Sequence, residues 1–403
     1  MNHLNLTNQQ YSIMLQRDLD IIDHSYYQDY FADKVVLITG GGGSLGMKMI
    51  EKLINMRVKR VVSIDRSPHS VYNIKNVFND SRVEARLVDI VDFVSLDDVF
   101  DQSLPDLVIH CAADKLVEQS EDKFKHMYTT NVQGTINVAN CVLNVQQMHH
   151  KRCDLVNVSS FMVDVTNNVV ALTKKLGERV VDMYSDANER VANSFMINVR
   201  IGNIVDSSDN VVQSMFETFN TGKMFELYHS IDKHLFCTRE EVISDIFALV
   251  NTIDRKRCEG ELTLLTEYGD RVDWLTGTYI PCIMLGSRVQ PISVLNLYTN
   301  TCKMMYSNPD YYSTRNDTER KYKYDSFDQI NDLYGEWINA PVISYSVRED
   351  VVGDEEDGVH RKYKLPRNNT NLTKNFCNAM SKALSINDKR ALHIGLTVLK
   401  DML

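Results

Sequence analysis

A glycine-rich turn between an apolar run and an amphipathic segment is the feature that most constrains this chain. The apolar run covers residues 35–38, the turn covers 39–46, and residues 47–54 follow with helical spacing of apolar side chains. A strand, a glycine turn and a helix in this order place a dinucleotide pyrophosphate at the helix N-terminus. The sequence therefore predicts a nucleotide-binding unit inside an α/β fold.

Three glycines of the turn have separate expected roles. Gly40 permits the tight turn, Gly43 lets the backbone approach a phosphate, and Gly46 lets the helix pack closely on the strand. Ser44 and Leu45 lie between the last two glycines. We therefore expect all five residues to contact the cofactor.

An acidic residue ends the second apolar run, where the ribose of a dinucleotide is expected. Asp65 stands nineteen residues after Gly46, and an acid at this place hydrogen-bonds the ribose hydroxyls. Arg66 follows directly and could instead meet a 2′-phosphate. The cofactor is thus predicted to be NAD or NADP, with the choice left open.

The third and fourth runs end in residues expected near the adenine and beneath the cofactor. Asp89 and Ile90 close the third run, and Ala112 and Ala113 close the fourth. Small side chains there leave room for a dinucleotide to pass over the chain.

Short apolar runs alternate with longer amphipathic segments up to about residue 200. This alternation predicts a doubly wound parallel α/β sheet of the Rossmann type, with helices on both faces. Strands are expected at 35–39, 60–65, 85–88, 107–111, 155–159 and 195–199, and crossover helices at 124–145 and 168–184.

Four segments are expected along the chain. They are a lead-in at 1–33, the dinucleotide-binding domain at 34–200, a small substrate-type lobe at 201–290, and a C-terminal extension of unknown role at 291–403. No internal repeat or long Pro/Gly linker separates them.

The overall charge and the cysteines narrow the class of protein. A net charge of −10 argues against a nucleic-acid binder, because phosphate contacts need clustered Lys and Arg. The eight cysteines form no Cys-x-x-Cys pair, and no cluster has metal-ligand spacing. With no secretory signal and no membrane-length apolar stretch, a soluble intracellular protein is expected.

The run from about residue 15 to residue 286 resembles the nucleotide-sugar 4,6-dehydratases of the polysaccharide-biosynthesis group, which are extended short-chain dehydrogenase/reductase proteins. The matching segments are Arg17-Asp18-Leu19-Asp20-Ile21, Lys34 to Gly46, Ile64-Asp65-Arg66-Ser67, Asp89-Ile90-Val91-Asp92, His110 to Val117, Thr130-Asn131-Val132-Gln133-Gly134-Thr135 and Arg200-Ile201-Gly202-Asn203. The resemblance implies that Lys115 and Lys174 bind the cofactor. It also implies that Glu121, Asn203 and Lys233 stand at substrate-type positions.

The segment after the fifth strand departs from that family. The family has Ser-Thr-Asp-Lys-Ala where this chain has Ser159-Ser160-Phe161-Met162-Val163. The acid and base of dehydration therefore correspond to Phe161 and Met162, which cannot exchange protons. Dehydration requires hydride removal at C4, proton abstraction at C5 and protonation of the C6 hydroxyl. Each lost acid–base group costs about 10²–10⁴-fold in rate.

Three further positions weaken the expected binding of a nucleotide sugar. Asp206 and Asp209 follow Asn203 and would face a pyrophosphate with like charge. Lys233 stands where the family has an arginine, and lysine loses the bidentate geometry of a guanidinium. We therefore expect impaired binding of a UDP-sugar.

Three interpretations remain at this point. The first is a catalytically degenerate dehydratase-like protein, a pseudoenzyme, that keeps an NAD(P) pocket and serves a structural, assembly or regulatory role. It would work through protein partners or a homo-oligomer. The second is an active, divergent dehydratase or epimerase that uses Ser159, Ser160 and Lys174, with an acid from Asp114, Lys115 or Asp164. The third is a ligand-free structural Rossmann module.

Overall fold

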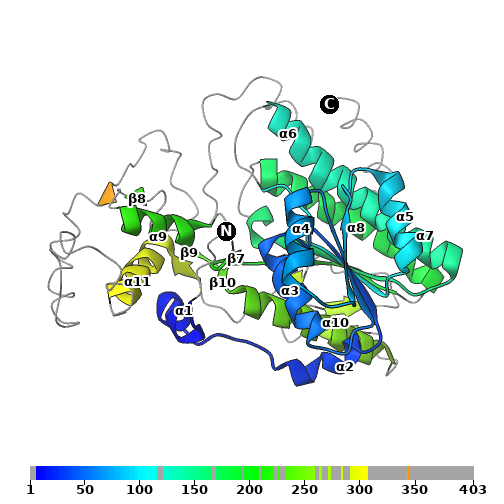
Figure 1. Cartoon of the computed structure of the whole chain (residues 1–403), viewed down its shortest axis with the longest axis horizontal. Coiled ribbons are helices and arrows are strands. Elements are labelled where there is room, and N and C mark those ends of the chain that lie inside the picture. The colour runs from blue at the N-terminus through cyan, green and yellow to red at the C-terminus, as the bar shows by residue number, and fades with distance from the viewer. Residues whose placement is uncertain are drawn as a thin grey trace. The chain divides into compact units, whose positions relative to one another are not determined.

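The computed structural model (Figure 1) describes residues 6–115, 121–164, 169–192, 194–207, 210–221, 225–226, 233–258, 263–265, 271–273, 283–284, 291–306 and 343–344. Most of the expected C-terminal extension, apart from 291–306 and 343–344, lies outside the described residues.

A seven-stranded sheet with all neighbours parallel forms the centre of the described chain. Its strands run in the order β13-β6-β5-β4-β1-β2-β3. They are β1 (Val35–Thr39), β2 (Arg60–Asp65), β3 (Val83–Leu87), β4 (Leu107–His110), β5 (Asp154–Ser160), β6 (Met196–Ile201) and β13 (Ile283–Met284). The reversal of strand order between β1 and β4 creates the crevice where open α/β sheets bind ligands. This confirms the predicted Rossmann-type fold.

Helices flank the sheet on both sides (Figure 1). The helices of the described chain are α1 (Asn8–Leu15), η1 (His24–Tyr26), α2 (Gln28–Phe31), α3 (Ser44–Ile54), α4 (Pro68–Val77), α5 (Phe93–Ser103), α6 (Glu121–Tyr128), η2 (Thr129–Gln133), α7 (Gly134–His149), η3 (Phe161–Asp164), α8 (Val169–Ala192), α9 (Val211–Thr221), α10 (Arg239–Cys258) and α11 (Val294–Tyr306). Side chains alternate between the two faces of a strand, and Leu37 of β1 packs in a cluster with Phe100 of α5 and Val142 of α7. Its fully buried neighbours Val36 and Ile38 face the other side.

The crossover predicted as one helix at 124–145 is divided into α6, the π-helical turn η2 and α7. Thr130, Asn131 and Val132 of η2 are buried. A π turn widens the helix locally and is frequent at functional sites. Here it turns Asn131 toward the carboxyl ends of the strands, where its side chain contacts the loop after β4.

The described residues divide into two compact units that are not contiguous in sequence. One unit draws on Ile22–Ile201 and Val242–Ser287, and holds the seven-stranded sheet. The other draws on Met1–Ile21, Gly202–Glu241 and Arg288–Val352. The lead-in expected as one segment is therefore shared between the two units. Each unit has its own apolar cluster.

The second unit combines helices with short paired strands. Its pairs are β7 (Asn203–Ile204) with β10 (Phe236–Cys237), β9 (Lys233–His234) with β14 (Ile292–Ser293), and β8 (Phe225–Glu226) with β15 (Ile343–Ser344). Its apolar cluster joins Met14 of α1, Val212 of α9 and Leu297 of α11. The remaining pair, β11 (Thr263–Leu265) with β12 (Arg271–Asp273), lies in the unit that holds the sheet.

Candidate functional site

The glycine turn after β1 forms a backbone cradle, called the glycine cradle below, in which Cβ atoms at Gly40 and Gly46 would collide with neighbouring backbone. Gly40 has φ +66°, and a Cβ there would lie 2.8 Å from the backbone of Ala112. A Cβ on Gly46 would lie 2.6 Å from Cα of Gly41. Gly43 is the N-cap of α3 and carries no side chain to cap the helix start. The turn and the helix N-terminus thus have the form that accepts a phosphate group.

The predicted ribose acid is held against this turn. One carboxylate oxygen of Asp65 accepts the N–H of Gly42 at 3.0 Å, and the other accepts the N–H of Ser67 at 2.9 Å. Both bonds orient the carboxylate at the end of β2, beside the glycine cradle. The structure therefore brings the predicted acid and the predicted phosphate turn together.

Arg66 has partners on the other side of the crevice. Its guanidinium lies 2.6 Å from Nε2 of His126 and 3.4 Å from the hydroxyl of Thr130. The same guanidinium lies 4.0 Å from the buried carboxylate of Asp114, and His126 lies 3.3 Å from it. Arg66 therefore joins the end of β2 to the loop after β4 and to α6.

A hydrogen-bonded chain runs beneath the loop after β4. Thr135 donates its hydroxyl hydrogen to the carbonyl of Asn131 at 2.7 Å, so it accepts from Nε2 of His110 at 3.1 Å. Nδ1 of the neutral ring then accepts from the hydroxyl of Thr39 at 2.6 Å. That hydroxyl accepts the N–H of Ala112 at 3.1 Å. The chain fixes one tautomer of the imidazole.

His110 is a neutral structural group. Burial, together with the charge of Lys174, lowers the pKa of His110 to about 3. The imidazole is 2 % exposed and both ring nitrogens are engaged. It therefore holds the backbone of the crevice in place and offers no proton to a substrate.

Asn131 links the loop after β4 to helix α8. Its amide oxygen accepts the N–H of Asp114 at 2.7 Å, and its amide nitrogen donates to the carbonyl of Asp114 and to the hydroxyl of Thr173. A Cβ on Gly177 would lie 2.8 Å from the carbonyl oxygen of Asn131. The glycine thus lets α8 approach η2 closely.

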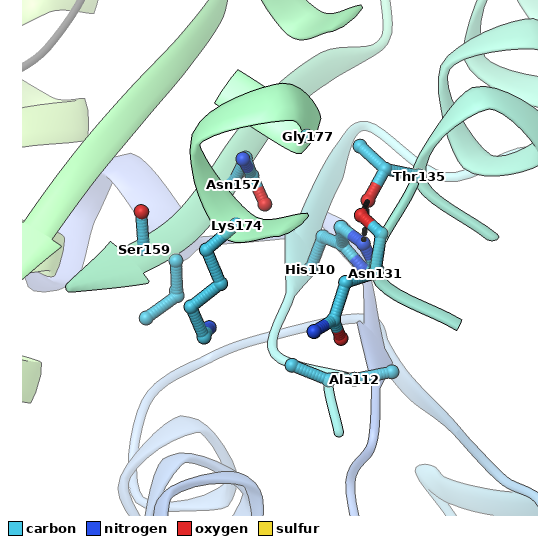
Figure 2. A pocket seen from close by; sticks show the side chains of 10 residues that line it. His110, Ala112, Asn131, Thr135, Asn157, Ser159, Lys174 and Gly177 are labelled. Atoms are coloured by element: carbon cyan, nitrogen blue, oxygen red, sulfur yellow. Dashed lines mark hydrogen bonds between the residues drawn. The ribbon is translucent and has the colours of Figure 1, made fainter. Parts of the chain in front are cut away.

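A cleft opens where these elements meet, and Figure 2 shows its lining. It holds about 260 Å³ of space, including its mouth. Its lining residues are His110, Ala112, Ala113, Asn131, Thr135, Asn157, Val158, Ser159, Lys174 and Gly177. Three of the predicted cofactor residues, Ala112, Ala113 and Lys174, therefore share one cleft with Ser159.

Ser159 and Lys174 are the two reactive side chains of this cleft. The hydroxyl of Ser159 is buried and has no hydrogen-bond partner in the described chain. Burial lowers the pKa of Lys174 from its ordinary value, while the nearby carboxylate of Glu178 opposes this effect. A polar atom left without a partner inside a cleft fits a bound polar ligand.

Cys111, which follows β4 and is close enough to Lys174 to be affected by its charge, is not an activated thiol. Burial raises the pKa of Cys111 to about 12, although the charge of Lys174 opposes the shift. A thiol in this state remains protonated at neutral pH.

The segment after β5 contributes apolar side chains. Phe161 is 8 % exposed and Val163 is 3 % exposed. Neither lines the cleft. The side chains of Met162 and Asp164 lie outside the described part, so the proposed replacement acid at Asp164 stays a prediction. Ser160 is half-buried at the end of β5.

The remaining residues predicted to bind the cofactor or the substrate lie in the turns after β3 and β4 and at the start of α6. Asp89 accepts the N–H of Val91 at 3.0 Å in the turn after β3. Ile90 is buried, whereas Ala113 and Lys115 are exposed at the mouth of the loop after β4. Glu121 begins α6, and its side chain lies outside the described part.

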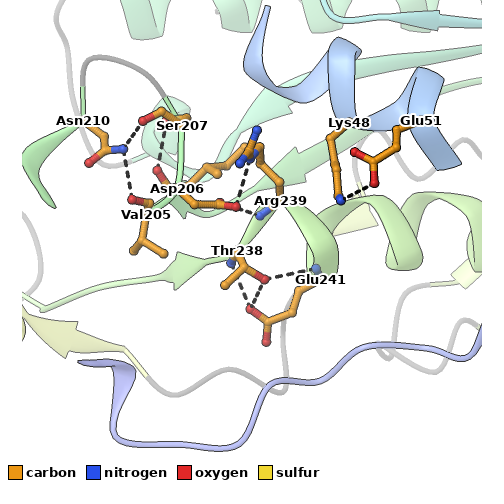
Figure 3. A network of polar contacts seen from close by, with 10 residues as sticks. Lys48, Glu51, Val205, Asp206, Ser207, Asn210, Thr238, Arg239 and Glu241 are labelled. Carbon is orange, nitrogen blue, oxygen red and sulfur yellow. Dashed lines mark hydrogen bonds and ion pairs between the residues drawn. The ribbon is translucent and has the colours of Figure 1, made fainter. Parts of the chain in front are cut away.

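In the second unit, the expected repulsion by Asp206 is corrected. Its carboxylate accepts the backbone N–H of Arg239 at 2.7 Å and a guanidinium N–H of the same residue at 2.9 Å (Figure 3). This pairing neutralises the charge on which the expectation depended. Asp209 lies outside the described residues. Asn203 begins β7 and Lys233 begins β9, but the lysine side chain is not described.

Sequence reasoning did not single out several side chains of the site. Thr39 and His110 end β1 and β4, and Asn157 lies next to His110 in the middle of β5. Polar residues at the ends of apolar runs were the available signal, because parallel strands end at one edge of the sheet. Asn157 donates to Asn198 at 2.7 Å and so joins β5 to β6.

The comparison with protein families gives the same assignment as the geometry. The model for the polysaccharide biosynthesis protein family matches residues 36–249, more than half of the chain. The chain belongs to this family. The matched range begins in β1 and ends in α10, so it includes the glycine cradle, the Asn131 linkage and the cleft.

Curated relatives of the family are distant. The capsular polysaccharide biosynthesis protein CapD of Staphylococcus aureus is 23% identical over 59% of this chain and 39% of its own length. A dTDP-glucose 4,6-dehydratase of Neisseria meningitidis is 32% identical over 26% of this chain and 30% of its own. A UDP-glucose 4-epimerase of Rickettsia prowazekii is 24% identical over 56% and 62%. The chain thus spans less than two thirds of these relatives.

Solved structures support the fold. The Bordetella bronchiseptica enzyme WbmF in complex with NAD+ has a TM-score of 0.50 at 15% identity, over 70% of this chain and 80% of that one. A UDP-glucose 4-epimerase of Thermotoga maritima with UDP-glucose also gives 0.50, at 14% identity over 81% and 88%.

Neither a membrane-spanning helix nor a metal-binding cluster occurs among the described residues. None of the described helices is long and apolar enough to cross a membrane. The described His, Cys, Asp and Glu residues include no group that could hold a metal ion.

Proposed function

We propose that this protein binds NAD(P) in the glycine cradle and cleft without dehydrating a nucleotide sugar, and that it serves an assembly or regulatory role. One combination supports the proposal. The glycine cradle, the carboxylate of Asp65 and the cleft that Lys174 lines are present, while the segment that would supply acid and base carries the buried side chain of Phe161.

The residues present suit separate parts of a dinucleotide. The turn at Gly40 and Gly46 leaves room for the pyrophosphate, and Asp65 lies at its edge for the adenosine ribose. Lys174 and the unpartnered hydroxyl of Ser159 offer polar contacts for the nicotinamide half. A bound nicotinamide cofactor would supply hydride transfer to this site.

Dehydration needs more than hydride transfer. A base must remove the C5 proton and an acid must protonate the leaving hydroxyl, each within hydrogen-bond reach. Apart from Ser159 and Lys174, the polar groups that line the cleft are the neutral imidazole of His110, hydrogen-bonded at both ring nitrogens, the hydroxyl of Thr135 and the amides of Asn131 and Asn157. None of these groups exchanges protons near neutral pH.

A second candidate function rests on Ser159 and Lys174. A hydroxyl without a partner beside a lysine of lowered pKa could assist reversible oxidation of an alcohol. Such a site would act as an epimerase or oxidoreductase without dehydration. Among the described residues that line the cleft none carries a carboxylate, which makes this the weaker proposal.

Isothermal titration of the purified chain with NAD+ and with NADP+ tests the proposal. We expect saturable binding of a dinucleotide, weakened at least about tenfold in Lys174→Met, which loses a charged hydrogen-bond donor. Lys175→Met is the matched control on the same helix and is expected to bind as the original chain does. Failure of both dinucleotides to bind would refute the proposal.

A further inference from the structure

β3 is the last strand at one side of the seven-stranded sheet in the described part of the chain. Among the described strands, β3 pairs only with β2. The N–H of Val61 donates to the carbonyl of Arg82, and the N–H of Val88 donates to the carbonyl of Asp65. Both bonds involve even-numbered residues of the β3 segment. The peptide groups of even-numbered residues therefore point toward β2.

The odd-numbered residues of β3 direct their peptide groups outward. Peptide groups alternate in direction along a strand. The N–H and C=O groups of Ala85 and Leu87, and the C=O group of Val83, therefore face the open edge. The N–H of Val83 already donates to Asp80 in a local turn.

The sequence of this strand is complementary to itself in the antiparallel direction. A two-fold axis at Ala85 would make Ala85 of each copy exchange both backbone hydrogen bonds with the other. Glu84 of one copy would then stand opposite Arg86 of the second, and Val83 opposite Leu87. Two opposite-charge pairs and two apolar pairs result from one register.

The side chains that would meet are accessible. Leu87 is 56% exposed, and the side chains of Arg86 and Glu84 are 47% and 29% exposed. Arg86 forms an ion pair with Glu84 of its own strand, and Glu84 also lies 3.4 Å from the guanidinium of Arg60 on β2, so these side chains share one face of the sheet. In a paired edge each could exchange this partner for one in the second copy.

We propose that two copies of this chain associate through β3, joining their sheets into one continuous sheet. Charged residues on an edge strand usually prevent such pairing. Here the two charges are opposite and symmetrically placed about Ala85, so they favour pairing of identical edges. This surface does not involve the cleft, and the inference holds whether or not a dinucleotide binds.

Ala85→Pro tests the backbone part of the proposal. Proline removes the N–H that faces the open edge and leaves the bonds to β2 intact, an arrangement that edge strands tolerate. Sedimentation equilibrium of the full chain should give twice the 46.3 kDa mass for the original protein and the single mass for the variant. Ala85→Gly keeps the N–H and should still dimerise.

Charge reversal tests the side-chain part and does not depend on proline being tolerated. Glu84→Arg and Arg86→Glu should each weaken dimerisation at least about tenfold, because like charges then face each other. Mixing these two variants should restore dimers, since every facing pair is again opposite in sign. The double variant should also dimerise.

Two results would overturn the proposal. One is a monomer for the original chain at every concentration tested. The other is a dimer that persists in Ala85→Pro and in both single charge reversals, which would place the interface elsewhere.

Discussion

At the residue scale, the glycines of the turn differ in what surrounds them. Gly46 faces the backbone of Gly41, which cannot move aside, whereas the nearest atom to a Cβ on Gly43 is a carbonyl oxygen at 3.2 Å. Gly43 also has φ −72°, which any residue adopts. At Gly46 the packing of the fold leaves no room for a side chain. At Gly43 the fold leaves room, and only the expected approach of a phosphate requires glycine.

We therefore expect Gly46→Ala to lower the free energy of unfolding by about 1–3 kcal/mol, as overpacking does. Gly43→Ala should cost less than about 1 kcal/mol yet still weaken dinucleotide binding. Urea unfolding and NAD+ titration of both variants separate the two effects. Equal losses of stability would contradict this account.

The buried imidazole of His110 predicts a pH dependence of stability. Its pKa is lowered by burial from 6.5 to about 3. Between these values the unfolded chain binds a proton that the folded chain does not, so stability falls as pH is lowered through this window. The contribution approaches about 1.4 kcal/mol per pH unit.

His110→Gln removes this contribution. The variant should be less stable than the original chain at pH 7.5, because the chain to Thr39 and Thr135 is broken. It should lose less stability on acidification to pH 5, as measured by urea unfolding. Parallel pH curves for the two proteins would show that another group titrates.

At the element scale, the strands followed from sequence more closely than the helices. The bounds of β1 and β2 agree with prediction, because continuous apolar runs ended by a glycine turn or an acid mark buried strands. Gly134 follows η2 and begins α7, but an isolated glycine in a helical pattern does not by itself predict a π-helical turn. The break at η2 follows from the tertiary contacts of Asn131, which a local pattern does not contain.

In the candidate site, too, the local motifs were predicted and the long-range contacts were not. The glycine turn and Asp65 were predicted and lie together. Two interactions were not predicted: the contact of Arg66 with His126 and the pairing of Arg239 with Asp206. Each joins residues at least 33 positions apart in the sequence. Local spacing identifies a motif but does not say which distant side chain will neutralise a charge.

Helix α8 supplies a prediction at this scale. Gly177→Ala would place a methyl group 2.8 Å from the carbonyl oxygen of Asn131, pushing α8 away from η2. Despite the higher helix propensity of alanine, we expect a net loss of about 1–3 kcal/mol and weaker dinucleotide binding. Lys175→Ala is the control and should change unfolding by less than about 0.5 kcal/mol. A stabilised Gly177→Ala would contradict the close approach.

At the scale of the whole molecule, the N-terminal segment holds the smaller unit together. The guanidinium of Arg17 binds the carboxylate of Glu241 at 2.5 and 3.1 Å and the carbonyl of Phe236 at 3.0 Å. Burial alone would raise the pKa of Glu241, but hydrogen bonds from Arg17 and the N–H of Thr238 outweigh it and lower the pKa.

We expect Arg17→Ala to lower the free energy of unfolding by about 3–5 kcal/mol, since it leaves a buried carboxylate without its partner. Arg57→Ala, which breaks an exposed pair with Asp29, is the control and should cost less than about 1 kcal/mol. Urea unfolding measures both. Similar small effects would mean that the Arg17 pair does not hold the unit.

The most direct test of the central claim is turnover of a UDP-hexose by the chain saturated with NAD+, followed by mass spectrometry. The account predicts dinucleotide binding and no 4-keto-6-deoxy product above the control without protein. Formation of that product, with loss of one water from the sugar, would contradict it.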